Sequence, residues 1–87
     1  MLEVGKNYYV RTDTDHWLGR LVSIDGPYTL TLTDFAWIAE SGRLGQFLAT
    51  GDGGQVMEIE AAPDGMTVTL NFRAVISWPH ALKRETV

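Results

Sequence analysis

The sequence predicts a small, mainly β domain, an antiparallel β-barrel of five to six strands with one short inserted helix. Turn-forming residues divide the 87-residue chain into short extended segments. Within several segments, hydrophobic and polar residues alternate with the period of two that is typical of a half-buried strand. One stretch alone has the spacing of an amphipathic helix. A chain of this length holds a single domain, residues 1–87, rather than two domains with separate cores.

The expected strands follow one another with tight turns between them. Tyr28, Leu30 and Leu32 face one side of their segment and threonines face the other, which predicts one buried face and one hydroxyl-rich face. Tight turns are expected at residues 25–27 and 63–65, which contain proline and glycine. We expect strands over residues 8–12, 16–24, 28–34, 56–61, 66–73 and 74–78.

The single helix is expected over residues 41–50, inside an insertion that runs from about residue 35 to 55. Ser41 is the expected N-cap, and Gly51 is the expected left-handed stop. Leu44, Phe47 and Leu48 have the spacing of one apolar helical face. From about residue 80 the chain is expected to form a polar tail.

Composition excludes several classes of protein. Hydrophobic residues make up 45% of the chain and charged residues 21%, as in an ordinary globular domain. The formal net charge of −4 argues against a generic basic surface that wraps nucleic acid. The chain has no cysteine, so disulfides and thiolate metal sites are impossible. The longest apolar run, residues 35–39, is far too short for a membrane span, and the N-terminus lacks the apolar core of a signal peptide. We therefore expect a soluble, cytoplasmic domain.

Two stretches carry a resemblance to a known family. Gly19 is followed by Leu21 two residues later and by Asp25 six residues later, and apolar alternation resumes at residues 29–32. A glycine at this place lets a strand bend sharply over a small barrel. This arrangement resembles the first signature of the Sm, LSm and Hfq family. The sequence of residues 70–76, Leu-Asn-Phe-Arg-Ala-Val-Ile, resembles the second signature, and most closely its Hfq version.

The resemblance implies an Sm-like (SH3-like) barrel whose copies pair their edge strands into a homo-oligomeric ring. It also implies that single-stranded RNA binds at loops that face the central pore. Thr29 stands where the family usually has a base-contacting asparagine, and Arg73 stands where the Hfq corner has a histidine. The nucleic-acid or nucleotide site implied by the resemblance contains Asp25, Thr29, Asn71, Phe72 and Arg73.

The insertion carries a second resemblance, because residues 34–43 look like part of small uncharacterised proteins from tailed phages and prophages. The interpretation is a non-catalytic ring protein of phage or prophage origin that binds RNA, DNA or a nucleotide. The expected protein partners are further copies of the same chain. No membrane, cofactor or metal is expected. Two alternatives stay open: a phage structural or protein-interaction module without nucleic-acid binding, and a sponge for signalling nucleotides.

Each candidate residue also has a purely structural interpretation. Arg73 would pair with Glu58 or Glu60 across the sheet, and Phe72 would pack inward with its strand neighbours. The three expected neighbours of Phe72 are Met66, Val68 and Leu70. Trp37 and Trp78 are expected in the core or at an interface rather than as ligand platforms.

A catalytic or metal-binding role has little support in the sequence. His16 lies beside Asp13 and Asp15, but ligands from one hairpin rarely complete a zinc site. We expect an exposed turn with a local hydrogen bond there. No activated serine or cysteine accompanies a histidine, so no nucleophilic triad is expected. The aromatic side chains exceed what so small a core easily hides, which favours self-association.

Overall fold

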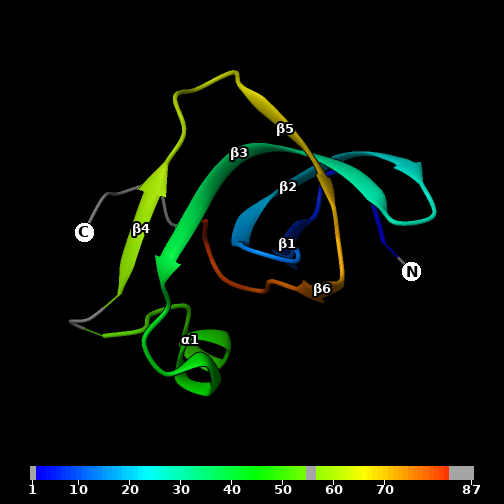
Figure 1. Ribbon diagram of the computed structural model, residues 1–87. Coiled ribbons are helices and arrows are strands. Elements are labelled where there is room, and N and C mark those ends of the chain that lie inside the picture. Colours follow the sequence, from blue (N-terminus) through cyan, green and yellow to red (C-terminus); the bar gives the residue numbers. More distant parts are fainter. Residues whose placement is uncertain (1, 55–56, 83–87) are drawn as a thin grey trace.

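Six antiparallel strands and one short helix make up the part of the chain described by the computed structural model, residues 2–54 and 57–82 (Figure 1). The expectation of a mainly β, antiparallel fold with one helix is therefore confirmed. The elements are β1 (Asn7–Arg11), β2 (His16–Gly26), β3 (Thr29–Glu40), α1 (Leu44–Thr50), β4 (Glu58–Ala61), β5 (Thr67–Asn71) and β6 (Ala74–Ser77).

The strands form one sheet that curls on itself. Its order is β4-β3-β2-β1-β6, and β5 pairs with β3 beside β4. Residues 29–33 of β3 pair with β5, whereas residues 36–40 pair with β4. Only Phe72 and Arg73 separate β5, on β3, from β6, on β1. A two-residue connection between strands that pair with β3 and β1 requires the sheet to curl, as the path of β5 into β6 shows in Figure 1.

The long strand β3 changes partner at Asp34. Asp34 has a φ of 48°, a left-handed conformation that aspartate tolerates better than most residues, and its carboxylate forms an ion pair with Arg20. The expected end of this strand at residue 34 is wrong, because β3 continues to Glu40 and includes residues first assigned to the insertion. Ala36 and Ile38 are buried and continue the alternation, but hydrophobic residues on the opposite face mask it in the sequence.

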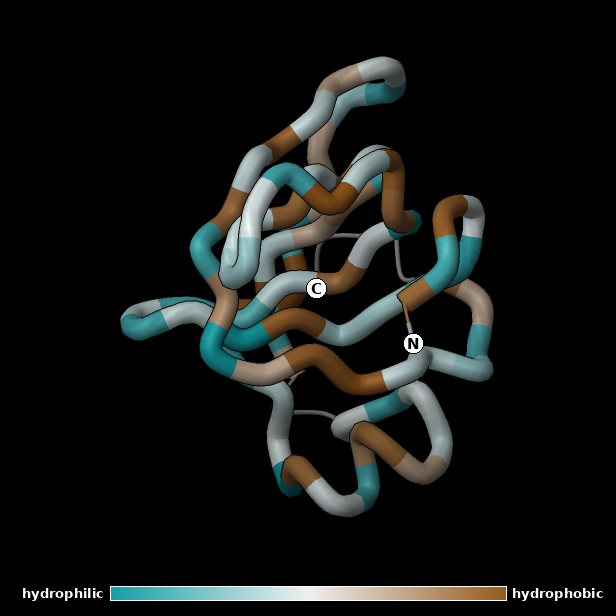
Figure 2. Tube along the Cα trace, turned by 90° about the vertical axis from the view of Figure 1, so that its right-hand side faces the viewer, coloured by the Kyte–Doolittle hydropathy of each residue, from teal (hydrophilic) through white to brown (hydrophobic). Residues whose placement is uncertain are grey.

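The core consists of two clusters on opposite faces of β1. Tyr9 belongs to the first cluster, whereas Tyr8 and Val10 belong to the second. Three consecutive residues of β1 are therefore buried, and hydrophobic stretches recur along the strands in the colouring of Figure 2. The first cluster comprises Tyr9, Leu18, Ala36, Ile38, Phe47, Met57, Ile59 and Trp78. The second comprises Tyr8, Val10, Leu21, Leu30, Leu32 and Leu70.

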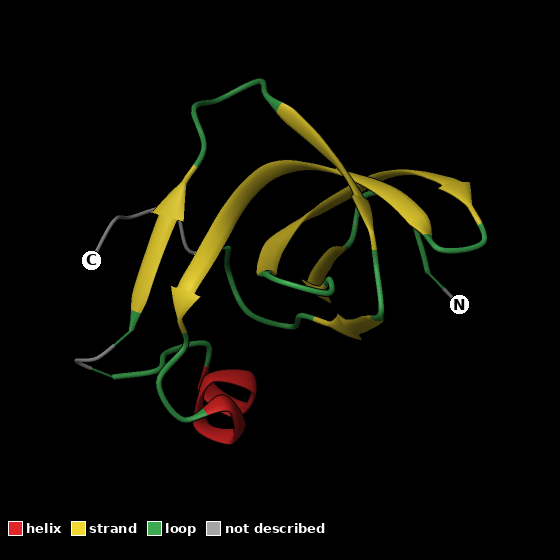
Figure 3. Cartoon of the chain, in the orientation of Figure 1, coloured by secondary structure: helices red, strands yellow, loops and turns green. Residues whose placement is uncertain are grey.

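The helix α1 lies at one end of the sheet, beside the end of β3 (Figure 3). Phe47 is its fully buried residue and packs on Trp78, with ring centroids 4.9 Å apart. Gly51 adopts the left-handed conformation expected of it, and its N–H donates to the Phe47 carbonyl. The expected N-cap is wrong: Arg43 occupies that position, and Ser41 lies two residues before it. In the described ranges, no helix has the length and apolar character that crossing a membrane would need.

The expected polar tail is partly a packed segment. The ring of His80 lies 4.9 Å from that of Trp78, and its Nε2 lies 2.9 Å from the Leu48 carbonyl oxygen. Leu82 also packs against the first core cluster. The remaining tail, residues 83–87, and the expected strand start at Val56 lie outside the described residues.

We predict that replacing Gly19 with alanine destabilises the curled sheet. An added Cβ would lie 2.9 Å from Leu32 Cβ and 3.2 Å from Phe35 Cβ, where β2 and β3 pack closely. The expected loss is about 1–3 kcal/mol in the free energy of unfolding, measured by urea denaturation.

The matched control is Gly45→Ala in α1, where an added Cβ meets nothing within 4 Å. This change should raise stability by about 0.5–1 kcal/mol, because alanine is the better helix former. A Gly19→Ala protein as stable as the wild type would contradict the close-packing argument.

Candidate functional site

Four of the five residues implied as site residues line one pocket at the corner between β5 and β6. This corner pocket has a volume of about 380 Å³, within the roughly 300–1,000 Å³ typical of small-molecule sites. Its lining residues are Asp13, Pro27, Tyr28, Thr29, Asn71, Phe72 and Arg73. The fifth residue, Asp25, lies outside it.

The pocket forms because the turn between β2 and β3 lies against the β5–β6 corner. Thr29 and Asn71 are register partners, and the Phe72 N–H donates to the Tyr28 carbonyl oxygen at 2.8 Å. The Thr29 hydroxyl donates to the Asn71 side-chain oxygen at 2.9 Å. This hydrogen bond fixes the orientation of the Asn71 amide, which has donors and acceptors suited to a base edge.

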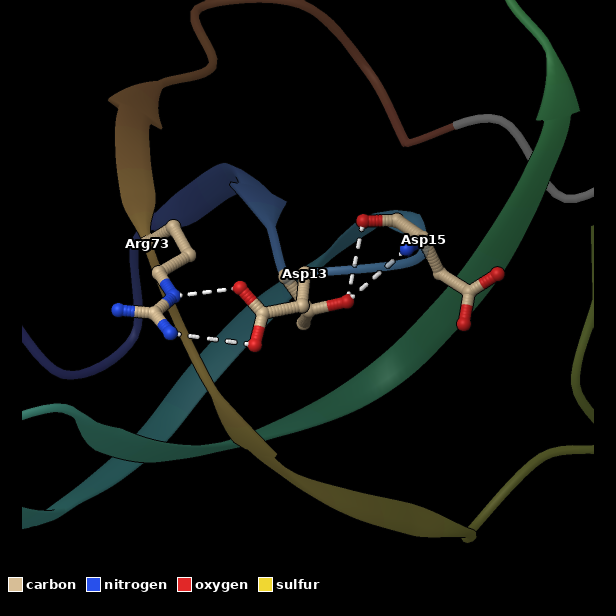
Figure 4. A network of polar contacts seen from close by, with 4 residues as sticks. Asp13, Asp15 and Arg73 are labelled. Carbon is tan, nitrogen blue, oxygen red and sulfur yellow. Dashed lines mark hydrogen bonds and ion pairs between the residues drawn. The ribbon is translucent and has the colours of Figure 1, made fainter.

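Arg73 is held at the rim of the pocket by Asp13, which lies on the turn between β1 and β2. Its Nε donates to Asp13 Oδ1 at 2.5 Å and its terminal nitrogen to Oδ2 at 3.2 Å, as Figure 4 shows. Hydrogen bonding and charge attraction lower the pKa of Asp13 and raise the pKa of Arg73. Both side chains remain 70% exposed. The expected partners, Glu58 or Glu60, are wrong: β4 pairs with residues 36–40 of β3, whereas the end of β5 next to Arg73 pairs with the start of β3.

Two aromatic residues form the apolar part of the corner pocket. Tyr28 is 70% exposed, and its ring meets the half-buried ring of Phe72 edge-on at 6.3 Å. Phe72 packs against the second core cluster, as its structural interpretation proposed, although Met66 is itself exposed. The expectation that Tyr28 faces inward with Leu30 is wrong, since Tyr28 lies on the turn. An aromatic residue directly after Pro27 was the signal that could have marked it as a site residue.

Asp25 accepts hydrogen bonds from two hydroxyl groups near the end of β2. Its Oδ1 accepts from Ser23 at 2.9 Å and its Oδ2 from Thr31 at 2.6 Å. Thr31 lies 2.9 Å from Thr69 across β3 and β5. These bonds give Asp25 a part in holding the hydroxyl-rich face rather than in lining the pocket.

The remaining candidates are placed elsewhere. The His16 Nδ1 contacts the hydroxyl of Tyr9, whose pKa is raised by burial and slightly lowered by Arg11. Trp78 is buried in the first core cluster, whereas Trp37 is 39% exposed. In residues 2–54 and 57–82, no three or more histidine, aspartate or glutamate side chains gather in a way that could hold a metal ion.

We predict that Arg73→Ala returns the pKa of Asp13 to its ordinary value, as measured by NMR titration of the side-chain carboxyl. The pKa of Asp13 is lower in the folded protein, so the ion pair adds stability above the ordinary carboxyl pKa. That contribution is lost as the pH falls through the lowered value. Arg43→Ala removes the same charge beside α1 and should leave the titration unchanged. An unaltered Asp13 pKa in the Arg73→Ala protein would rule out this pairing in solution.

Comparisons with protein-family models, curated proteins and solved structures give no match to this chain. The chemistry of the corner pocket therefore carries the functional inference.

Proposed function

We propose that the chain is a non-catalytic binding protein that takes one base of a single-stranded nucleic acid, or of a free nucleotide, in the corner pocket. The observation that carries this proposal is the convergence of Thr29, Asn71, Phe72 and Arg73 with the exposed ring of Tyr28. These residues come from two chain segments and supply different elements of base recognition.

The chemistry of each group suits a planar heterocycle. Stacking on an aromatic ring such as Tyr28 is worth about 1–3 kcal/mol per base and tolerates any base. The Asn71 amide supplies a donor and an acceptor for a base edge. The guanidinium of Arg73 can stack on a base or bind a phosphate. Single-stranded nucleic acids are commonly recognised through this combination.

The charges of the site favour binding through the base over binding through many phosphates. Among the residues that the structure describes, Arg73 is the one cation that lines the pocket, and Asp13 already occupies two of its donors. The net charge of −4 disfavours a long polyanion. For single strands, the logarithm of the binding constant falls with the logarithm of the salt concentration, with a slope of about −0.7 for each phosphate neutralised. We therefore expect a slope close to this value rather than a multiple of it.

The architecture we propose is an Sm-like barrel whose copies close into a homo-oligomeric ring. In the described part of the chain, β5 and β6 each pair with one strand, so each has an outer edge without a partner strand. Exposed hydrophobic side chains such as Val22, Ile24 and Ile76 support burial by further copies. Pairing of the β5 edge with the β6 edge of the next copy would repeat the corner pocket around one axis.

We predict that Tyr28→Ala and Arg73→Ala weaken the binding of short labelled RNA or DNA, measured by fluorescence polarisation. Loss of the stacking ring should reduce affinity about 10-fold, within the range given by base stacking on aromatic rings. Arg73→Ala should also remove most of the salt dependence.

Arg43→Ala is the matched control and should bind as the wild type does, since Arg43 lies outside the corner pocket. Nucleotides added as competitors separate a free-nucleotide site from a polymer site. Absence of binding by any RNA, DNA or nucleotide at hundreds of micromolar protein would overturn the proposed function.

We predict that light scattering gives a mass several times the 9.7 kDa of one chain, because ring closure requires several copies. The measurement is made on a dilution series, since edge-to-edge assembly depends on concentration. A folded particle that stays at 9.7 kDa would contradict the ring. Base binding by the single chain would still be tested by the fluorescence polarisation experiment.

A further inference from the structure

A second concave surface lies on the other side of the β1–β2 turn from the corner pocket. This aromatic groove has a volume of about 490 Å³. Its side chains include Asp15, Trp17, Phe35, Trp37, Glu60 and Met66. The turn separates the two sites, because Asp13 lines the corner pocket and Asp15 lines the groove. In Figure 4 the Asp15 side chain points away from Arg73.

The floor of the groove is a row of side chains across three strands. Trp17 on β2 is the register partner of Trp37 on β3, and Trp37 is the register partner of Glu60 on β4. Paired residues in an antiparallel sheet project from the same face, so these three side chains lie in sequence across it. Phe35 adds a third aromatic ring to the groove, with its centroid 5.7 Å from that of Trp17.

The carboxylates of the groove are placed beside its aromatic rings. The indole Nε1 of Trp37 donates to Asp15 Oδ1 at 3.1 Å, which fixes that carboxylate next to the ring. Glu60 lies on the other side of Trp37 and is exposed. Within residues 2–54 and 57–82, no basic residue lines the groove, so two negative charges flank the rings without a cation beside them. The groove is therefore complementary to a positive charge.

We infer that the aromatic groove binds an arginine side chain presented by a partner protein. A guanidinium is planar, stacks on indole rings and pairs with carboxylates through several donors at once. Arginine is preferred to lysine because a strongly hydrated ammonium stacks less well on a ring. The net charge of −4 adds long-range attraction for a basic partner.

A buried donor in the groove floor favours a peptide over a free cation. In the described part of the chain, the indole Nε1 of Trp17 is shielded from solvent and has no hydrogen-bond partner. A buried donor left in this state costs about 1–3 kcal/mol. A small rotation of the indole would let it donate to a backbone carbonyl beside the bound arginine, an acceptor that a guanidinium by itself lacks.

The experiment uses the capped tripeptide acetyl-Ala-Arg-Ala-amide and follows the three indole N–H signals of the full chain by NMR. The Trp37 and Trp17 signals should shift and saturate, while the Trp78 signal from the first core cluster should stay in place. The same peptide with citrulline in place of arginine keeps the shape and loses the charge, so it should bind at least 10-fold more weakly. Equal binding of the citrulline peptide would overturn the inference.

Variants on β4 separate the groove from general electrostatics. Glu60→Gln removes a groove carboxylate and should weaken the arginine peptide several-fold. Glu58→Gln removes the same charge from the same strand outside the groove and should not. Equal effects of the two changes, or no shift at tens of millimolar peptide, would overturn the inference. A Trp37 signal that shifts with protein concentration in the absence of peptide would show that a second copy of the chain occupies the groove. That result would also overturn the inference.

Discussion

The close contact between β2 and β3 at Gly19 is the constraint on which the rest of the structure depends. A side chain at this position would collide with Leu32, so only glycine lets the two strands pack this closely. The left-handed Asp34 then redirects β3 away from β5 and toward β4. The curled sheet that results brings β5 round to β6 and so creates both the corner pocket and the enclosed second core cluster.

One turn contributes to both concave surfaces. The Thr12 side chain accepts a hydrogen bond from the Asp15 N–H at 3.0 Å and donates one to the Asp15 carbonyl at 3.2 Å, while the Thr12 N–H donates to that carbonyl at 2.8 Å. This bonding fixes the turn. The side chain of Asp13 then contacts Arg73, whereas that of Asp15 points away from Arg73 (Figure 4) and contacts Trp37. Asp13 orients a cation in one site, and Asp15 adds an anion to the other. The two sites thus differ in charge, with an arginine in one and no basic lining residue described in the other, although Thr14 alone separates their aspartates.

Local pattern was enough to predict most strands and the helix, because burial of Leu30, Leu32 and Phe47 follows directly from residue spacing. The expected end of β3 at Asp34 failed because hydrophobic residues on both faces concealed the alternation. In the corner pocket, Thr29 and the β5–β6 corner came from the resemblance, whereas Asp13 was missed as the partner of Arg73. These two residues are 60 positions apart, and no local spacing specifies that contact. Asp25 was placed at the site by the resemblance, and the sequence alone does not reveal that the hydroxyls of Ser23 and Thr31 bind its two oxygens.

The Asp13–Arg73 pair has a consequence for selectivity. A phosphate that reaches Arg73 must share or displace a carboxylate that already accepts two hydrogen bonds, so a phosphate alone gains little. A ligand that also stacks on Tyr28 and bonds to Asn71 gains from contacts that Asp13 does not oppose. The acidic partner would thereby disfavour simple anions and leave the proposed recognition of a planar base intact. In a chain with a net charge of −4, the proposed binding would depend mainly on this shape and hydrogen-bond complementarity, since the whole chain does not attract a polyanion.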